Sequence, residues 1–443
     1  MKLIYLKSLL LIGFLFTHTH SKAQWTLQTD SLPASSGIKG ICIIDANTVW
    51  ALGYNGAQPA KQTRFFTRTT DGGNLWKVDS VKTSSPLPSD QGLTNLCAIN
   101  ADTAWVAAFS PANTTVGGVY RTNDGGVTWA KQATAAFNVN SYPDFVHFWD
   151  KNNGIAFADP NPSSFEIYTT TDGGTTWVAV PSANIPAPLS GEYGGLGVFS
   201  VNGNTIWETT TSGRVLKSTD MGLHWTVSTI LANKQLNNIV FKDLNNGLCQ
   251  VGTKNDTLMR TTDGGSTWAL VPVIGVYLKG DLCYAPGTNP MYVVVGVSFV
   301  AGTSYSTDDG TTWVSLESTE RHTCVSFLNT SIGWSGTFVG PTGNGGMYKW
   351  NGTNGIQEYK NLLGLKLYPN PNNGLFHIAQ ENSTDGHIQI SVCDIVGKVI
   401  YNTSLTSNVS GLDMDLTSQP KGLYFVRVTN SKGESGVQKL VIE

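Results

Sequence analysis

Six copies of one short pattern, Ser/Thr-x-Asp-x-Gly-x-x-Trp, constrain this chain of 443 residues more than any other feature. Successive copies, here called Asp-Trp segments, start 43 to 53 residues apart, the length of four short strands with their turns. Such a unit is typical of one blade of a β-propeller. The repeat therefore predicts a ring of small antiparallel sheets rather than several unrelated domains. The copies read TTDGGNLW (69–76), TNDGGVTW (122–129), TTDGGTTW (170–177), STDMGLHW (218–225), TTDGGSTW (261–268) and STDDGTTW (306–313).

A second pattern runs between the Asp-Trp segments: an apolar strand, a turn, and another apolar strand. It occurs seven times, from GICIIDANTVWALG (40–53) to CVSFLNTSIGWSGT (324–337), against six Asp-Trp segments. The mismatch is resolved if the N-terminal WTLQTD (25–30) pairs with GMYKWN (346–351), which otherwise lacks a following strand. We therefore expect an all-β chain with a seven-bladed propeller over residues 24–355. Its N-terminal strand would complete the last blade.

Each Asp-Trp segment is expected at the turn between the two outer strands of a blade. The Asp carboxylate can accept hydrogen bonds from backbone N–H groups just ahead of it, and the Ser/Thr hydroxyl can add another. Glycine allows a backbone shape that a β-carbon would oppose, and Trp is a large apolar wedge. Because these residues recur in every copy, we predict a structural role for them rather than catalysis by one of them. They are Asp71, Asp124, Asp172, Asp220, Asp263 and Asp308, with Trp76, Trp129, Trp177, Trp225, Trp268 and Trp313.

Charge and cysteine content argue against several function classes. Charged residues make up 13% of the chain and its net charge is −3, which disfavours nucleic-acid binding. None of the six cysteines forms a Cys-x-x-Cys pair, so we predict no metal and no cofactor. The cysteines are expected to be buried free thiols. A disulfide between neighbouring strands after export is the alternative.

Residues 1–23 have the pattern of a signal peptide. Lys2 and Lys7 precede the apolar run LLLIGFLF (9–16), and SKA (21–23) offers small residues for cleavage before Gln24. The apolar run is too short to span a bilayer. The rest of the chain has no longer apolar run, so we predict an exported protein without a transmembrane segment.

The pattern changes after residue 355. Residues 356–364 have the composition of a linker. Strict alternation in IQISV (388–392) and LYFVRV (423–428) predicts half-buried strands, and NPNNG and PKG are turn signals. We expect residues 365–443 to form a small Ig-like β-sandwich.

Both regions resemble known families. The Asp-Trp segments are similar to the Asp-box, or BNR, repeat of sialidases, xyloglucanases, sortilin-type receptors and, closest in pattern, photosystem II assembly-factor-like propellers. That resemblance implies the fold, whereas the activities of these families are unrelated. LYPNPNNG (367–374), DIVGKV (394–399), GLYFVRV (422–428) and KLVIE (439–443) resemble the type A C-terminal sorting domain of Bacteroidetes. This second resemblance implies export by the type IX secretion system to the cell surface or the medium.

Candidate site residues lie in long loops expected at the rim opposite the Asp-Trp segments. Asp159 and Glu192 are the candidate catalytic pair, because a glycosidase needs two carboxylates beside the sugar bond. Asp144, Trp149 and Tyr193 are candidate ligand contacts. The alternative, which the residue types favour, is that Asp159 starts a turn and Glu192 is solvated.

Other signatures of catalysis are missing. The Arg-Ile-Pro motif of sialidases does not occur, and xyloglucanases usually pair two propellers where this chain has one. His147 alternates within an apolar strand and is expected to be a hydrogen-bonded interior residue. We therefore predict a secreted or surface propeller that binds a glycan or protein, with the type IX machinery as a second partner. A glycoside hydrolase or lyase acting at the propeller mouth and a scaffold factor for envelope complexes are the alternatives.

Overall fold

The computed structural model describes fifteen stretches of the chain, and all structural statements below concern these residues. The chain divides into two units, Met1–Gly352 and Thr353–Glu443. Every regular element is a strand, except one 3₁₀ turn at Ser182–Asn184. The predicted signal peptide and linker lie outside the described residues. The stretches are 24–28, 32–56, 64–82, 92–110, 117–138, 141–161, 163–252, 256–296, 300–340, 345–352, 365–380, 388–394, 398–405, 411–430 and 435–443.

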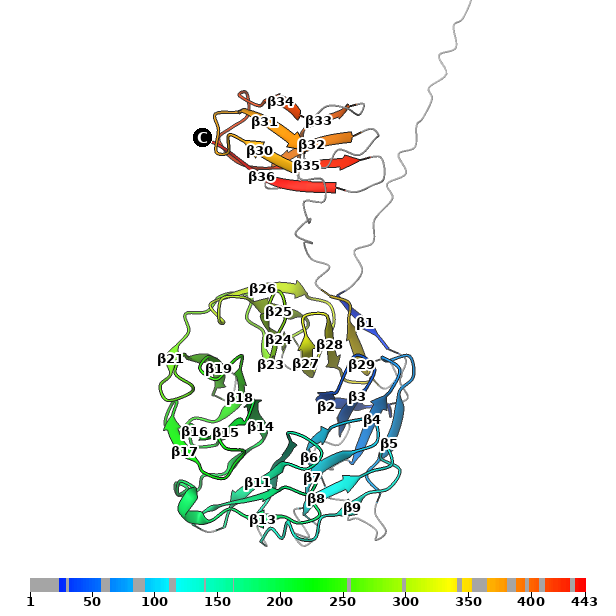
Figure 1. Ribbon diagram of the computed structural model, residues 1–443, viewed down its shortest axis with the longest axis vertical. Helices are drawn as coiled ribbons and strands as arrows, with labels where there is room; N and C mark the ends of the chain where they lie inside the picture. Colours follow the sequence, from blue (N-terminus) through cyan, green and yellow to red (C-terminus); the bar gives the residue numbers. More distant parts are fainter. Residues whose placement is uncertain are drawn as a thin grey trace, which may run out of the picture. The chain divides into compact units, whose positions relative to one another are not determined.

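Antiparallel four-stranded sheets follow one another along the first unit, and within each the strands pair in chain order. Figure 1 shows the sheets around a common centre, with short strands such as β9, β13 and β17 at the periphery. This is the β-propeller architecture that the repeat predicted. Five sheets follow this order: β2 (Ser36–Ile43), β3 (Val49–Asn55), β4 (Phe65–Thr69) and β5 (Lys77–Ser80); β6 (Gly92–Ala98), β7 (Ala104–Phe109), β8 (Gly118–Thr122) and β9 (Ala130–Lys131); β10 (Pro143–Phe148), β11 (Gly154–Pro160), β12 (Phe165–Thr170) and β13 (Val178–Ala179); β14 (Gly194–Asn202), β15 (Thr205–Thr210), β16 (Arg214–Ser218) and β17 (Thr226–Thr229); β18 (Leu236–Phe241), β19 (Gly247–Val251), β20 (Thr257–Thr261) and β21 (Ala269–Leu270).

Two further sheets depart from this order. One gains a strand, because β22 (Ile274–Gly275) runs parallel to the outermost strand β26. The other is completed by the first strand of the chain, β1 (Trp25–Leu27), which pairs antiparallel with β29. The remaining members are β23 (Lys279–Ala285), β24 (Met291–Gly296), β25 (Thr303–Ser306) and β26 (Thr312–Glu317) in the first, and β27 (Cys324–Asn329), β28 (Ile332–Gly336) and β29 (Met347–Trp350) in the second.

β1 pairs with β29, as the sequence predicted, and the register places Trp25 opposite Trp350. Both rings are buried and their centroids lie 4.9 Å apart. Beyond the strands, the N–H of Asn351 donates to the carbonyl of Gln24 at 2.8 Å. The two ends of the first unit are therefore joined by backbone and side-chain contacts, and the edge of the last sheet is covered.

All six Asp-Trp segments have the same hydrogen-bond pattern. In the first, Thr69 Oγ1 donates to Asp71 Oδ1 (2.8 Å) and accepts the N–H of Gly73 (2.9 Å), while Leu75 N–H donates to Asp71 Oδ1 (3.0 Å). Gly73 has φ +94°, and a Cβ there would lie 2.3 Å from the Trp334 ring. The turn thus needs its glycine both for backbone shape and for space. The equivalent bonds recur around Asp124, Asp172, Asp220, Asp263 and Asp308.

The tryptophans of the Asp-Trp segments pack between neighbouring sheets. Trp129 contacts Phe66 of the preceding sheet edge-on, with centroids 5.7 Å apart, and Trp76 contacts Trp334 in the same way at 5.2 Å. Basic residues on third strands add a second link: the Arg121 guanidinium lies over Trp105 and donates to the carbonyl of Gly173 (3.0 Å). Trp177, Trp225 and Trp313 are also buried, and Trp268 is half-buried.

The cysteines are free thiols, and two of them link innermost strands. Cys42 Sγ accepts the N–H of Ala98, and Cys97 Sγ accepts the N–H of Phe148, both at 3.3 Å. Each thiol thus satisfies a backbone donor of the next sheet, which explains why small polarisable residues occupy these positions.

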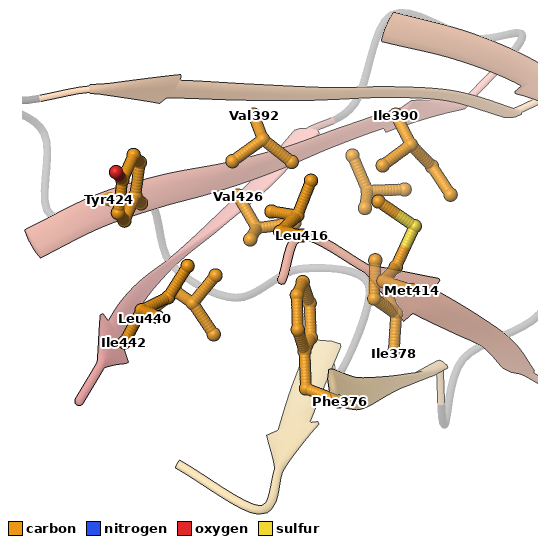
Figure 2. Close-up of a cluster of buried hydrophobic side chains, with 11 residues drawn as sticks. Phe376, Ile378, Ile390, Val392, Met414, Leu416, Tyr424, Val426, Leu440 and Ile442 are labelled. Atoms are coloured by element: carbon orange, nitrogen blue, oxygen red, sulfur yellow. The ribbon is translucent and has the colours of Figure 1, made fainter. Parts of the chain in front are cut away.

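The second unit consists of two antiparallel sheets around its own core. Figure 2 shows Phe376 and Ile378 of one sheet facing Ile390, Val392 and Val426 of the other. The described residues of the whole chain contain no helix long and apolar enough to cross a membrane. The sheets are β30 (Leu365–Tyr368), β31 (Leu375–Gln380) and β34 (Gly411–Asp415), and β33 (Val399–Leu405), β32 (Ile388–Asp394), β35 (Gly422–Asn430) and β36 (Ser435–Ile442).

Candidate functional site

The candidate residues of the sequence analysis are divided between the two rims of the ring. Trp149 begins the turn from β10 to β11, beside an Asp-Trp segment, where Asn152 O accepts the N–H of Gly173 at 2.9 Å. Its indole N–H donates to the carbonyl of Gly203 at 2.9 Å. Asp144 lies at the other end of β10, five residues or roughly 16 Å away. The structure therefore does not bring Trp149 together with the other candidates.

A cavity of about 570 Å³ lies at the opposite rim and collects three of the five candidates, Asp144, Asp159 and Tyr193. We call it the rim cavity. Its lining comes from four neighbouring sheets and is mostly apolar or aromatic. Phe109 and Tyr142 meet edge-on there with centroids 5.8 Å apart, and Tyr193 is 53% exposed. The other lining residues are Gly194, Gly195, Leu196, Val198, Thr211, Gln235, Leu236 and Asn237.

Asp144 reaches the rim cavity from a β-bulge. The register of β10 against β11 shifts between Pro143 and Phe145, so Asp144 has no partner residue on the neighbouring strand. Asp144 is fully buried, and neither of its carboxyl oxygens has a hydrogen-bond partner among the described residues. A Cβ on Gly194 would lie 2.1 Å from Asp144 Oδ2, so the glycine makes room for this carboxyl group.

Two more carboxyl groups lie close to Asp144. Asp159 also occupies a register shift, between β11 and β12, and its Oδ1 accepts the N–H of Gly194 at 3.0 Å. Glu208, in the middle of β15, is fully buried; its Oε1 accepts the N–H of Gly195 at 2.9 Å and its Oε2 has no partner in the described chain. The sequence analysis missed Glu208. The signal was available, since the position after the second-strand tryptophan is Ala51 or Val106 in other sheets and Glu208 here.

Burial raises the pKa values of all three carboxyl groups, and repulsion from neighbouring carboxylates adds to this at Asp144 and Glu208. Burial raises the pKa of Asp159 to about 6. Burial, followed by the charge of Asp159, raises the pKa of Asp144 well above its usual value. The pKa of Glu208 is raised by burial and then by the charges of Asp144 and Asp159. Asp159, in the lining of the rim cavity, can therefore take up and release a proton near pH 6.

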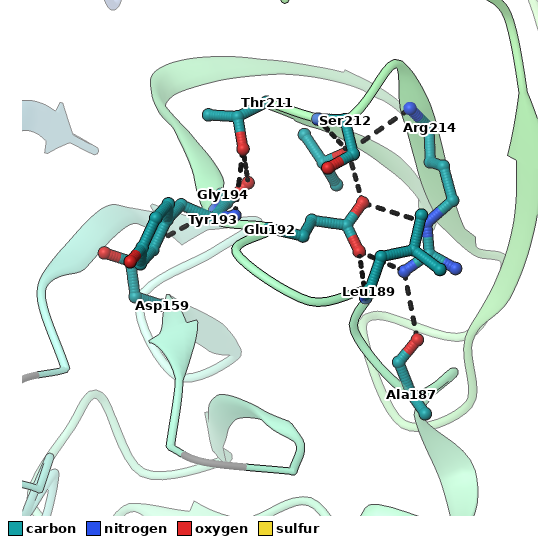
Figure 3. Close-up of polar contacts among 10 residues, drawn as sticks. Asp159, Ala187, Leu189, Glu192, Tyr193, Gly194, Thr211, Ser212 and Arg214 are labelled. Atoms are coloured by element: carbon teal, nitrogen blue, oxygen red, sulfur yellow. Dashed lines mark hydrogen bonds and ion pairs between the residues drawn. The ribbon is translucent and has the colours of Figure 1, made fainter. Parts of the chain in front are cut away.

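Glu192 has a different environment, which removes it from the predicted catalytic pair. Arg214 Nε donates to Glu192 Oε1 at 2.9 Å, and Arg214 Nη2 forms an ion pair with Oε2. Thr210 Oγ1 (2.6 Å) and Leu189 N–H (2.8 Å) donate to the same carboxylate. Burial alone would raise the pKa of Glu192, but these donors hold it below the usual value. Figure 3 shows this carboxylate directed towards Arg214, with Asp159 on the far side of Tyr193.

Two expectations about Glu192 and His147 are therefore corrected. Glu192 is neither solvated nor paired with Asp159, because Arg214 at the start of β16 neutralises it inside the protein. His147 is interior, but its Nε2 is buried with no hydrogen-bond partner in the described part of the chain, and burial lowers its pKa to about 4. His147 instead packs edge-on against Trp149 at 4.9 Å, as a neutral apolar ring. Across the described stretches, no group of three or more His, Cys, Asp or Glu side chains has the geometry of a metal site.

Comparison with known families assigns the second unit. Residues 366–443 match the family described as the Secretion system C-terminal sorting domain. The chain thus carries a sorting tail behind a propeller, which indicates a protein delivered to the cell surface or the extracellular space. No curated protein matches the chain in sequence.

Solved structures are similar to the propeller. One, described as YCF48 bound to D1 peptide, is 14% identical, with 74% of this chain and 96% of that chain covered and a TM-score of 0.50. YCF48 from Cyanidioschyzon merolae is 20% identical, with 74% and 99% covered and a TM-score of 0.53. Identities this low show the fold alone. An ancestral GH74 enzyme is 12% identical with a TM-score of 0.48; 94% of this chain matches 63% of that one, less than two thirds of its length.

Proposed function

We propose that this chain is an exported propeller that binds a glycan or protein ligand, without catalysis, in the rim cavity. The observation that carries the proposal is the cavity itself: about 570 Å³, lined by three aromatic rings and several aliphatic side chains, with Asp144 and Asp159 in its lining. Binding sites are typically concave and apolar with a few placed polar groups. Because Glu192 forms an ion pair with Arg214, it is less suited to act together with Asp159 in hydrolysis.

The architecture that supports this function is a seven-bladed ring. Seven sheets in the described part of the first unit follow the repeat, and β1 completes the last of them. We propose that the Asp-Trp segments have a structural role and stabilise the turns of the blades, because their carboxylates accept hydrogen bonds within their own turns. Residues 24–355 would form the propeller, 1–23 a signal peptide, 356–364 a linker, and 365–443 an Ig-like sandwich.

One observation favours hydrolysis as the second candidate function. Asp144 and Asp159 both line the rim cavity, and the raised pKa of Asp159, about 6, suits a general acid. Cleavage of a glycosidic bond also needs a second carboxylate that is ionised, and burial disfavours the ionised form of Asp144. Binding therefore remains the better supported function.

Paired assays of binding and turnover test the proposal. The secreted chain is applied to glycan and peptide arrays, and released reducing ends are measured on every glycan that it binds. Leu196→Trp places a large ring at the mouth of the rim cavity and should abolish binding. Leu75→Trp is the matched control, since both leucines are 58% exposed but Leu75 lies in an Asp-Trp segment. Binding that survives Leu196→Trp contradicts the proposal, and turnover that is lost in Asp159→Asn establishes the hydrolase instead.

Export is tested separately by removing residues 365–443. We expect the truncated chain to accumulate in the periplasm, because the sorting tail directs the last membrane crossing. Fractionation of cells and medium measures this. Normal extracellular levels of the truncated chain would refute the role of the tail and leave the binding proposal untouched.

A further inference from the structure

We propose that the rim cavity recognises a lysine or arginine side chain of a peptide, with Asp144 and Asp159 as counter-charges and Phe109, Tyr142 and Tyr193 around the alkyl stem. The inference rests on the proposed function, since it names the ligand group that the same cavity holds. It goes further in committing to a cationic anchor and to a peptide.

Among the described residues, Asp144 makes none of the side-chain hydrogen bonds that a structural buried carboxyl group makes within a protein. Asp144 is one of the residues that line the cavity, and both of its carboxyl oxygens are buried with no partner in the described chain. A buried polar group without partners costs on the order of 1–3 kcal/mol, and more when it is charged. A donor arriving from the cavity would satisfy these oxygens.

A half-buried carboxyl group, that of Asp281, shows how the fold treats an aspartate when it is structural. Asp281 lies in the corresponding bulge of another innermost strand, where the register shifts between Lys279 and Leu282. Its Oδ1 accepts from Asn238 Nδ2 at 2.7 Å, and its Oδ2 accepts the N–H of Val325 at 2.8 Å. Asp281 thus holds neighbouring sheets together, whereas Asp144 has no such bonds. The difference points to a partner outside the chain.

The charge of the rim cavity favours a cationic ligand. None of the described residues that line the rim cavity is Lys, Arg or His. Arg214, the nearby cation, is already paired with Glu192. The titratable groups facing Asp144 are Asp159, Glu208, Tyr142 and Tyr193, so ionisation leaves the cavity negative. Anionic ligands are therefore disfavoured, and a cation would relieve the repulsion among the carboxylates.

The shape and polarity of the rim cavity favour a long side chain with an apolar stem. Aromatic faces attract cations, and Lys and Arg stems cover apolar surface with three or four methylene groups. Phe109, Tyr142, Leu196, Val198 and Leu236 supply such a surface. An amino sugar also carries a cation, but its ring hydroxyls would lie against a lining that is mostly apolar or aromatic. A basic peptide side chain therefore fits better.

The test uses the full secreted chain and three blocked amino acids followed by NMR titration. Nα-acetyl-lysine methylamide and Nα-acetyl-arginine methylamide are the probes, and the norleucine analogue has a similar stem without charge. We expect at least one cationic probe to bind about ten-fold more tightly than norleucine. Asp144→Asn and Asp159→Asn should each abolish the preference, whereas Asp256→Asn, which removes an exposed carboxylate, should preserve it. Equal affinity for all three probes, or a preference that survives both pocket variants, would overturn the inference.

A measurement on the unaltered chain makes the test independent of any folding defect. Cation binding lowers the pKa values of the Asp144 and Asp159 carboxyl groups. Calorimetry in two buffers of different ionisation enthalpy should therefore detect proton release near pH 6. Its absence contradicts the inference, and tighter binding of glucosamine than of both probes contradicts the peptide assignment. If these tests fail while Leu196→Trp still abolishes array binding, the proposed function stands and the cationic anchor does not.

Discussion

Aspartates on the two rims of the propeller experience opposite environments. In the Asp-Trp segments, hydrogen bonds lower the pKa values of Asp124 and Asp263 to about 2, the side-chain bonds from Thr128 and Thr267 being the largest cause. At the other rim, burial raises the pKa of Asp159 to about 6. The residue type is the same, but the number of donors around the carboxylate differs. The comparison teaches that recurrence in this fold goes with satisfied hydrogen bonds, whereas Asp144, whose carboxyl oxygens have no partner among the described residues, lies at the opposite rim.

Glu192 belongs with the satisfied group although it lies at the opposite rim. Removing its cation gives the largest effect that we predict. Arg214→Met should lower the free energy of unfolding by about 3–5 kcal/mol, because a buried carboxylate loses its partner. Chemical denaturation of the propeller measures the change. In the control Lys279→Met, which breaks an exposed pair with Asp256, the loss should stay below about 1 kcal/mol. Equal losses would mean that burial of Glu192 is immaterial.

The two rims should also respond oppositely to pH. Asp159 binds more protons folded than unfolded, so the stability it contributes falls as pH rises from about 3.8 through about 6. Asp124 binds fewer protons folded, so its contribution is complete above about pH 3.8 and is lost towards pH 2. Each group can change the free energy of unfolding by at most about 1.4 kcal/mol per pH unit. Melting temperatures of Asp159→Asn and Asp124→Asn relative to wild type, measured from pH 3 to 7, should diverge in opposite directions. Slopes of the same sign would contradict the comparison.

Truncating a single Asp-Trp carboxylate should have a smaller effect. Asp124→Ala removes the acceptor for Thr122 Oγ1, Thr128 N–H and Thr128 Oγ1. These donors can turn to water because the site is exposed, so we expect a loss of about 1 kcal/mol in denaturation. A loss of several kcal/mol would show that the turn depends on this carboxylate alone.

The smallest effect is expected at Asp144, where no hydrogen bond is lost. Asp144→Asn keeps the shape and removes the buried acid, so the free energy of unfolding should stay constant or rise by less than about 1 kcal/mol. Calorimetric melting measures it. A clear destabilisation would show that Asp144 has a structural partner, and would remove the main argument for a ligand at this carboxyl group.

The repeat made most of the propeller predictable, because each of its residues has a local job. Threonine, aspartate and glycine within one segment bond to each other, so their spacing alone specifies the turn. The closing pair Trp25 and Trp350 was predictable for a related reason: each end of the repeat lacked its complement.

The site was less predictable, because its contacts come from different strands. Trp149 is only five residues from Asp144, but a strand carries them to opposite rims. The charge of Glu192 is neutralised by Arg214, which lies 22 positions later in the sequence. No local sequence pattern predicts this ion pair. The pKa of Asp144 is raised by the charge of Asp159, and the pKa of Glu208 by the charges of both, although the three residues lie on different strands. Counting strand residues would have placed Trp149 correctly; the ion pair required the structure.

The union of β1 with β29 links positions as far apart as 325 residues along the chain, as in the bond from Asn351 to Thr26. A contact this distant forms late, since the intervening polypeptide must first be available. Until β1 has paired with β29, the last sheet has a free edge. A product cut short before Met347 would lack β29, and its free edge would remain open to association with other chains.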